Sequence, residues 1–176
     1  MYKIDYSKLR SGDIVMTGGG GIFAALIRFF TAKGIRKSKA VTHVGILVDF
    51  NGQLLLAEMK KEGLSISSLE EYNSEYKYIV NIGRCFNMND DKIIALDRII
   101  AYDRRKTLDY DWKGILSFVT GTTGSKNKYY CSEYIAHLLR CVEIRFWPEE
   151  RNISPEDISN AFKINLLGHM VHWREQ

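Results

Sequence analysis

Cysteine and proline are scarce in this 176-residue chain, and each scarcity excludes a class of architecture. The three cysteines, Cys85, Cys131 and Cys141, are too sparse and odd in number for a disulfide framework, and they lack the spacing of a zinc-binding pair. We therefore expect a reducing compartment, or no dependence on disulfides. Because the chain has only two prolines, no proline-rich linker divides it, and its length predicts a single domain over residues 1–176.

A membrane-crossing run, a signal peptide and a strong charge imbalance are missing too. The longest apolar stretch, Gly21 to Phe30, is broken by Arg28 and is too short to cross a bilayer. The N-terminus is polar and carries Asp5, unlike a signal peptide, so we expect a cytoplasmic protein or one exported by another route. The net charge is +4, and aromatic residues do not alternate with basic ones, so no nucleic-acid partner is predicted.

The apolar segment at residues 22–30 predicts a short helix, and a basic segment at residues 33–39 follows it. One interpretation is a helix packed on the sheet with a solvated basic loop behind it. The other is a lip that makes peripheral contact with a membrane or lipid, through an acyl chain or an anionic surface. The glycines at 18–21 are not followed by the Lys-Ser/Thr pair of a phosphate loop, so no nucleotide cofactor is expected.

The stretch from Tyr129 to Arg140 places a cysteine at the start of a predicted helix. Apolar residues recur at helical spacing and give this helix one apolar face: Ile135, Leu138, Leu139 and Val142. Cys131 falls in the first turn, where unpaired backbone N–H groups and the helix dipole favour the nucleophilic thiolate. The alternative is that Cys131 is a small buried hydrophobic residue, as most unpaired cysteines are.

The clearest predicted strand covers residues 41–50. The Asn51-Gly52 pair after it is a strong signal for a two-residue hairpin turn, and residues 53–59 form the returning strand. This turn pairs Phe50 with Gln53, which sets the register of the whole hairpin.

In that register, His43 and Glu58 project from the same side of the hairpin as diagonal neighbours. Gly45 lies between them and has no side chain to separate them, so the carboxylate can orient the imidazole. A shift of one residue would put Glu58 on the other face. Taken singly, each residue reads equally well as a polar side chain on a solvated face.

The other segments complete a predicted α+β fold. They are strands at 14–16, 76–82 and 166–173, helices at 90–105 and 115–120, and a short helix capped by Ser154. Residues 60–75 are predicted as a loop with a short extended piece at 64–66. We expect an antiparallel sheet packed against helices, with His137, His169 and His172 as structural or surface residues.

Five short motifs, taken in chain order, resemble one known family. They are Gly12-Asp13-Ile14-Val15, Thr42-His43-Val44-Gly45-Ile46, Glu58, Tyr110-Asp111 and Tyr130-Cys131-Ser132-Glu133. This set resembles the permuted NlpC-type, papain-like family of the YiiX and YaeF kind, to which lecithin:retinol acyltransferase is distantly related. The likeness extends from about residue 9 to about residue 142.

The resemblance implies a circularly permuted papain-like (NlpC-type) fold, in which the histidine strand precedes the cysteine helix. It implies that Cys131 is the nucleophile, His43 the base and Glu58 the orienting residue, and that Tyr110 matches a tyrosine near the oxyanion site. Family members are amidases or peptidases of cell-wall peptides, or acyltransferases and lipid hydrolases. The expected function is a cysteine hydrolase or acyltransferase acting on an amide or ester bond of a peptide or acyl-containing substrate, without a metal or other cofactor.

Two further interpretations remain open. One is a non-catalytic module on the same fold that binds peptides or acyl chains in the same cleft. The other is a metal site, because His43, Glu58 and Cys131 are plausible zinc ligands, although they lack the usual close spacing. The sequence indicates neither the oligomeric state nor the identity of the substrate.

Overall fold

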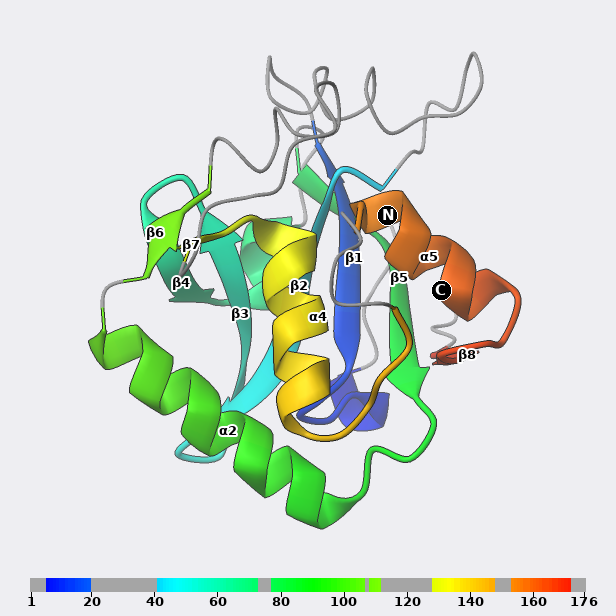
Figure 1. The fold of residues 1–176 in the computed structure, drawn as a ribbon, viewed down its shortest axis with the longest axis horizontal. Helices are drawn as coiled ribbons and strands as arrows, with labels where there is room; N and C mark the ends of the chain where they lie inside the picture. The colour runs from blue at the N-terminus through cyan, green and yellow to red at the C-terminus, as the bar shows by residue number, and fades with distance from the viewer. Residues whose placement is uncertain are drawn as a thin grey trace.

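The computed structural model describes residues 6–19, 41–72, 77–106, 108–111, 128–147 and 153–171 (Figure 1). The predicted helices at 22–30 and 115–120, the basic segment at 33–39, and His172 lie outside the described residues. The described part of the chain is a mixed α+β structure with an antiparallel sheet and three α-helices.

The main sheet has six strands in the order β4-β3-β2-β1-β5-β8, and neighbouring strands are antiparallel. In chain order these strands are β1 (Ile14–Gly19), β2 (His43–Phe50), β3 (Gln53–Lys60), β4 (Gly63–Ser67), β5 (Lys77–Cys85) and β8 (Gly168–Met170). Two short strands, β6 (Asp109–Tyr110) and β7 (Lys128–Tyr129), form a separate parallel pair just before the cysteine helix. The sheet therefore brings the N-terminal strand β1 next to β2, which begins with His43.

The β2–β3 hairpin has the predicted turn and register. Asn51 and Gly52 both have positive φ, at 56° and 81°, as a type I′ turn requires. Phe50 pairs with Gln53, and the pairing continues as far as Ile46 with Ala57. Glu58 directly follows the last bridged pair on β3, and His43 lies three residues before Ile46, at the start of β2.

The segment that was predicted as a loop at residues 60–75 contains more structure than its sequence indicates. Strand β4 pairs with the whole second half of β3, and it begins at Gly63, which has a φ of 105° and follows the turn at Lys61 and Glu62. The short 3-10 helix η2 (Leu69–Tyr72) follows. The extended piece predicted at 64–66 lies inside β4, and the strand is longer because its remaining residues pair with β3.

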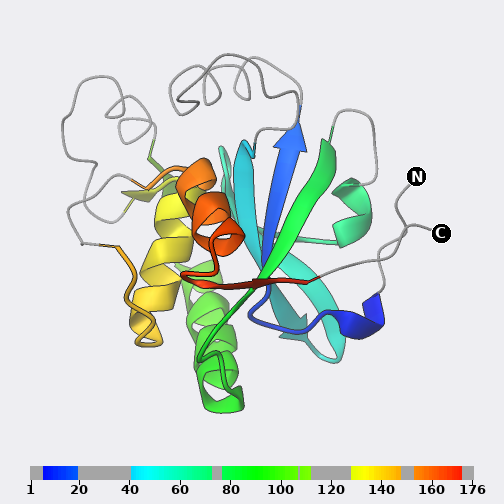
Figure 2. The same ribbon diagram turned by 90° about the vertical axis from the view of Figure 1, so that its right-hand side faces the viewer.

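The three helices cover one face of the sheet, as Figure 2 shows, and η2 lies on the other face. They are α2 (Asp90–Arg105), α4 (Cys131–Cys141) and α5 (Pro155–Lys163). The main core contains Ile46 and Val48 of β2 together with Ile135 and Leu138 of α4, all buried. A second core on the opposite face consists of Val15, Leu47, Leu56, Leu69, Tyr72 and Ile82.

Helices α2 and α5 begin at residues whose side chains cap them, whereas Tyr130, the N-cap of α4, makes no side-chain cap hydrogen bond. Asn89 caps α2 by accepting from the backbone N–H of Lys92, and Ser154 forms a capping box with Asp157 at the start of α5. Both starts match the sequence prediction. Among the described helices, none is both long and apolar enough to cross a membrane.

Candidate active site

Cys131 is the first residue of α4, and its side chain is buried at 2% exposure. The start of this helix is tied to the segment before α5 by two hydrogen bonds. Ser132 Oγ donates to the carbonyl of Ile153 at 2.6 Å, and the Ile153 N–H donates to the hydroxyl of Tyr130 at 3.2 Å. Hydrogen bonds made by Tyr130 and Ser132, the residues before and after Cys131, therefore help to fix the position of the thiol.

His43 and Glu58 form a direct hydrogen bond, as the hairpin register predicts. His43 Nε2 lies 2.7 Å from Glu58 Oε2, and because a carboxylate only accepts, the imidazole donates. Glu58 is fully buried, whereas the His43 side chain keeps 23% of its surface exposed. With Nε2 bound to Glu58, the other ring nitrogen, Nδ1, is left for the thiol side of the site.

The Glu58 carboxylate accepts hydrogen bonds from three further side chains that the sequence analysis did not identify. The Tyr72 hydroxyl donates to Oε2, the oxygen that also binds His43. Ser67 Oγ donates to Oε1 at 3.1 Å, and Lys60 Nζ lies 2.9 Å from the same oxygen. Both oxygens of this buried acid are thus occupied by donors from β2, β3, β4 and η2.

These contacts decide the charge of Glu58. Burial raises the pKa of the carboxyl, but the hydrogen bonds and charges of His43, Tyr72 and Lys60 outweigh it and lower the pKa to about 2. Glu58 is therefore an anion at neutral pH. Burial and the nearby Glu58 charge raise the pKa of Tyr72, which keeps that hydroxyl protonated and able to donate.

Cys131 and His43 shift each other's pKa toward an ion pair. Burial raises the pKa of the Cys131 thiol, but the adjacent His43 charge and hydrogen bond outweigh it and lower the pKa below its ordinary value. Burial lowers the pKa of the His43 imidazole, while Cys131 and Glu58 together raise it to about 10. The structure thus brings Cys131, His43 and Glu58 into one chain of contacts.

Two backbone N–H groups also contact the sulfur. Hydrogen bonds from the N–H groups of Val44 and Ser132 lower the pKa of Cys131. Ser132 supplies its N–H from the first turn of α4, as helix geometry predicts. Val44 supplies its N–H from β2, beyond the point where that strand stops pairing with β3. The sulfur position therefore has two fixed donors suited to negative charge.

Tyr110 is placed by its backbone only. It lies in β6 and pairs with Tyr129 in β7, two residues before Cys131. Its side chain lies outside the described part of the structure, so its predicted role near the oxyanion site stays a prediction.

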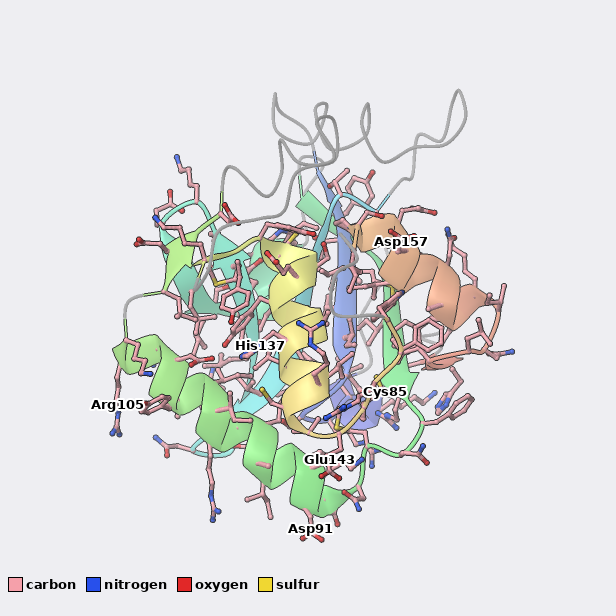
Figure 3. All side chains as sticks on the ribbon, viewed as in Figure 1. Cys85, Asp91, Arg105, His137, Glu143 and Asp157 are labelled. Carbon is pink, nitrogen blue, oxygen red and sulfur yellow. The ribbon has the colours of Figure 1, made fainter. Side chains whose placement is uncertain are left out.

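The other cysteines and histidines of the described ranges lie apart from this cluster. Figure 3 shows Cys85 at the end of β5 and His137 on α4. Burial raises the pKa of Cys85 to about 12, and burial also raises the pKa of the exposed Cys141. The ring of His137 contacts that of Tyr129 at a centroid distance of 4.9 Å, tilted by 30°, and His169 is an exposed residue of β8.

The fold and the site together define a class of protein: an antiparallel sheet that holds a His–carboxylate pair beside a cysteine at a helix start. No family model and no curated protein matches the chain. Among solved structures, the chain is similar to the crystal structure of the metalloprotein YiiX from Escherichia coli O157:H7, DUF1105. The TM-score is 0.58 and the sequence identity 15%, over 94% of this chain and 89% of that chain. The chain therefore has a YiiX-like fold.

Proposed function

We propose that this protein is a cysteine hydrolase or acyltransferase that acts on an amide or ester bond through Cys131, His43 and Glu58. The observation that supports this proposal most strongly is the buried Glu58 carboxylate, bound at 2.7 Å to His43, which in turn stabilises the Cys131 thiolate. A histidine held by a carboxylate and facing a cysteine is the arrangement that activates a thiol for covalent catalysis.

In the proposed reaction the Cys131 thiolate attacks the carbonyl carbon of the substrate and forms a carbon–sulfur bond. The negative charge that develops on the carbonyl oxygen is stabilised by backbone donors at the start of α4, foremost the Ser132 N–H. The protonated His43 then gives its proton to the leaving amine or alcohol as the carbon–nitrogen or carbon–oxygen bond breaks. A water or another nucleophile, deprotonated by His43, attacks the thioester and releases the thiolate.

The family relation belongs to this proposal as well. The permuted NlpC-type, papain-like family predicts the chain order that is seen here, with the histidine on β2 and the cysteine later on α4. On this proposal the substrate is a peptide or an acyl-containing molecule, such as a cell-wall peptide or a lipid ester, and Tyr110 assists at the oxyanion site.

A metal centre at these residues fits the structure poorly, although the structural neighbour YiiX is named a metalloprotein. A third protein ligand would have to come from Glu58, and both of its oxygens already accept from His43, Tyr72, Ser67 and Lys60. In the described ranges, no group of three or more His, Cys, Asp or Glu side chains is arranged to hold a metal ion. The proposed reaction therefore uses no metal.

Acylation by a chromogenic ester tests the proposal. Mixed with p-nitrophenyl acetate, the protein should release p-nitrophenolate in a rapid phase of about one equivalent, with the acetyl group on Cys131 by peptide mass spectrometry. His43→Ala should slow this phase by at least about 100-fold, since the residues of such a unit act together.

Cys141→Ser is the matched control, because it removes an exposed thiol and leaves the site intact. It should keep the rapid phase at full size, and Cys131→Ser should abolish it. A folded protein whose Cys131 stays unacylated, or an acetyl group on Cys141 alone, would contradict the proposal. That first result would favour the binding module.

A further inference from the structure

Glu58 carries more donors than orienting one histidine requires. His43 uses one hydrogen bond to Oε2, yet Tyr72 donates to the same oxygen and Lys60 binds the other at 2.9 Å. Lys60 also lies 3.6 Å from the exposed Glu71, whose side chain is 47% exposed. Tyr72 is itself buried at 6% exposure, in the core that lies away from the helices.

A fully buried carboxylate without such donors would be driven toward its neutral form, because burial penalises the charge. A protonated Glu58 has one acceptor oxygen fewer and no charge with which to hold a protonated imidazole. His43 would then lose the partner that keeps it cationic, and Cys131 would lose the cation that keeps it a thiolate. Whether Cys131 is a thiolate therefore depends on the side chains that bind Glu58, which act on the sulfur through Glu58 and His43.

In the described part of the chain, the charged and titratable groups around Cys131, His43 and Glu58 come from β2, β3, η2 and the start of α4. They are His43 from β2, Glu58 and Lys60 from β3, Glu71 and Tyr72 from η2, and Tyr130 and Cys131 at the start of α4. With Cys131 and His43 as an ion pair, Lys60 balances the charge of Glu58, so the buried part of the unit is close to neutral.

We propose that Tyr72 and Lys60 are positioning residues that keep Glu58 ionised and fixed, so that the Cys131–His43 ion pair persists into acidic solution. This inference rests on the proposed function, and it gives a role to Tyr72 of η2, in a segment that the sequence predicts as a loop. Neither residue reacts with substrate. Each acts on the sulfur through Glu58 and then His43.

A thiolate titration tests this inference without needing a substrate. The ultraviolet absorbance of the thiolate is followed against pH, and the same measurement on a Cys131→Ser counterpart is subtracted so that Cys131 alone is seen. Tyr72→Phe and Lys60→Met should each move the midpoint of thiolate loss upward by roughly one pH unit or more, a tenfold change in the equilibrium.

Two variants separate positioning from general damage. Lys60→Arg keeps the charge and should keep the wild-type midpoint within a few tenths of a pH unit. Glu71→Gln removes the exposed partner of Lys60 and should leave the midpoint unchanged. Circular dichroism should show that all variants are folded, and the nearly isosteric Tyr72→Phe decides the case alone if Lys60→Met unfolds.

Wild-type midpoints in Tyr72→Phe and in a folded Lys60→Met would overturn the inference. This failure differs from failure of the proposed function. In the latter, the wild-type protein itself shows no Cys131 thiolate near neutral pH and no acylation of Cys131.

Discussion

The three cysteines have different chemical environments, and this difference belongs to the residue scale. Cys131 contacts His43 and two backbone N–H groups, which lower the pKa of its thiol despite burial. Burial and the Asp13 charge raise the pKa of Cys85 to about 12, and burial raises the pKa of Cys141 although that side chain is exposed. Because alkylation requires the thiolate, we expect the buried Cys131 to be more reactive than the exposed Cys141.

We predict that iodoacetamide alkylates Cys131 faster than the more exposed Cys141 at pH 6, by about tenfold or more. As the pH rises toward the ordinary thiol range, Cys141 gains thiolate and the difference should shrink. Peptide mass spectrometry after timed quenching measures each site separately. His43→Ala should bring the two rates close together; Cys141 reacting first in the wild-type protein would refute the prediction.

The His43–Glu58 pair was predictable because the Asn51-Gly52 turn fixes the register of a short hairpin, and register alone puts both side chains on one side. Tyr72 was not predictable in this way. Its contact with Glu58 exists because η2 folds back over the end of β3, and no local pattern in residues 60–75 encodes that path. The closeness of Cys131 to His43 came from family resemblance and not from the pattern of the residues.

At the scale of elements, α5 involves two serines that we expect to affect stability in different ways, Ser154 at its N-cap and Ser159 inside the helix. Ser154 Oγ accepts from the Asp157 N–H at 3.1 Å, and the Ser154 N–H donates to Asp157 Oδ2 at 3.0 Å. Further along α5, Ser159 is fully buried, and its Oγ has no hydrogen-bond partner among the described residues. The first hydroxyl starts the helix, and the second is a buried polar group without compensation.

We predict that Ser154→Ala lowers the free energy of unfolding by about 1 kcal/mol, the usual value of an N-cap. Ser159→Ala should leave it unchanged or raise it, because an unbonded buried hydroxyl is replaced by a methyl group. Urea denaturation of both variants measures the two changes. An equal loss in both would show that the capping box is not the source of the effect.

Element boundaries that depend on local chemistry were the ones that sequence could predict. The Ser154-Pro155 start of α5 and the Asn89 cap of α2 lie where the capping pattern places them. Strand β5 runs on to Cys85, past its predicted end at residue 82, because its second half pairs with β8. Pairing of distant strands is a property of the assembled sheet, so no local pattern reports it.

For the whole molecule, the decisive feature is that the candidate site joins the two cores of the sheet. Cys131 belongs to the core beneath α4, and Tyr72 belongs to the core on the opposite face. Glu58 and His43 connect them. A substitution that destabilises one core should therefore differ from one in the other core in its effect on the thiolate titration of Cys131.

We predict that Leu69→Ala, in the core of Tyr72, lowers the free energy of unfolding by about 2–5 kcal/mol and also raises the midpoint of the Cys131 thiolate titration. Leu96→Ala, on α2 in the other core, should cost a similar amount and leave the midpoint in place. Both leucines are at most 1% exposed. Equal titration midpoints in the two variants would show that the second core does not support the site.

The order of the elements along the chain has a consequence for synthesis. Strand β2, which carries His43, leaves the ribosome early, whereas α4, which carries Cys131, follows only after α2 has been made. A polypeptide that stops before residue 131 contains His43 and Glu58 but lacks the thiol that they would activate on the proposed function. On the proposed function, the nucleophile therefore joins its base only after five of the six strands of the main sheet have been made.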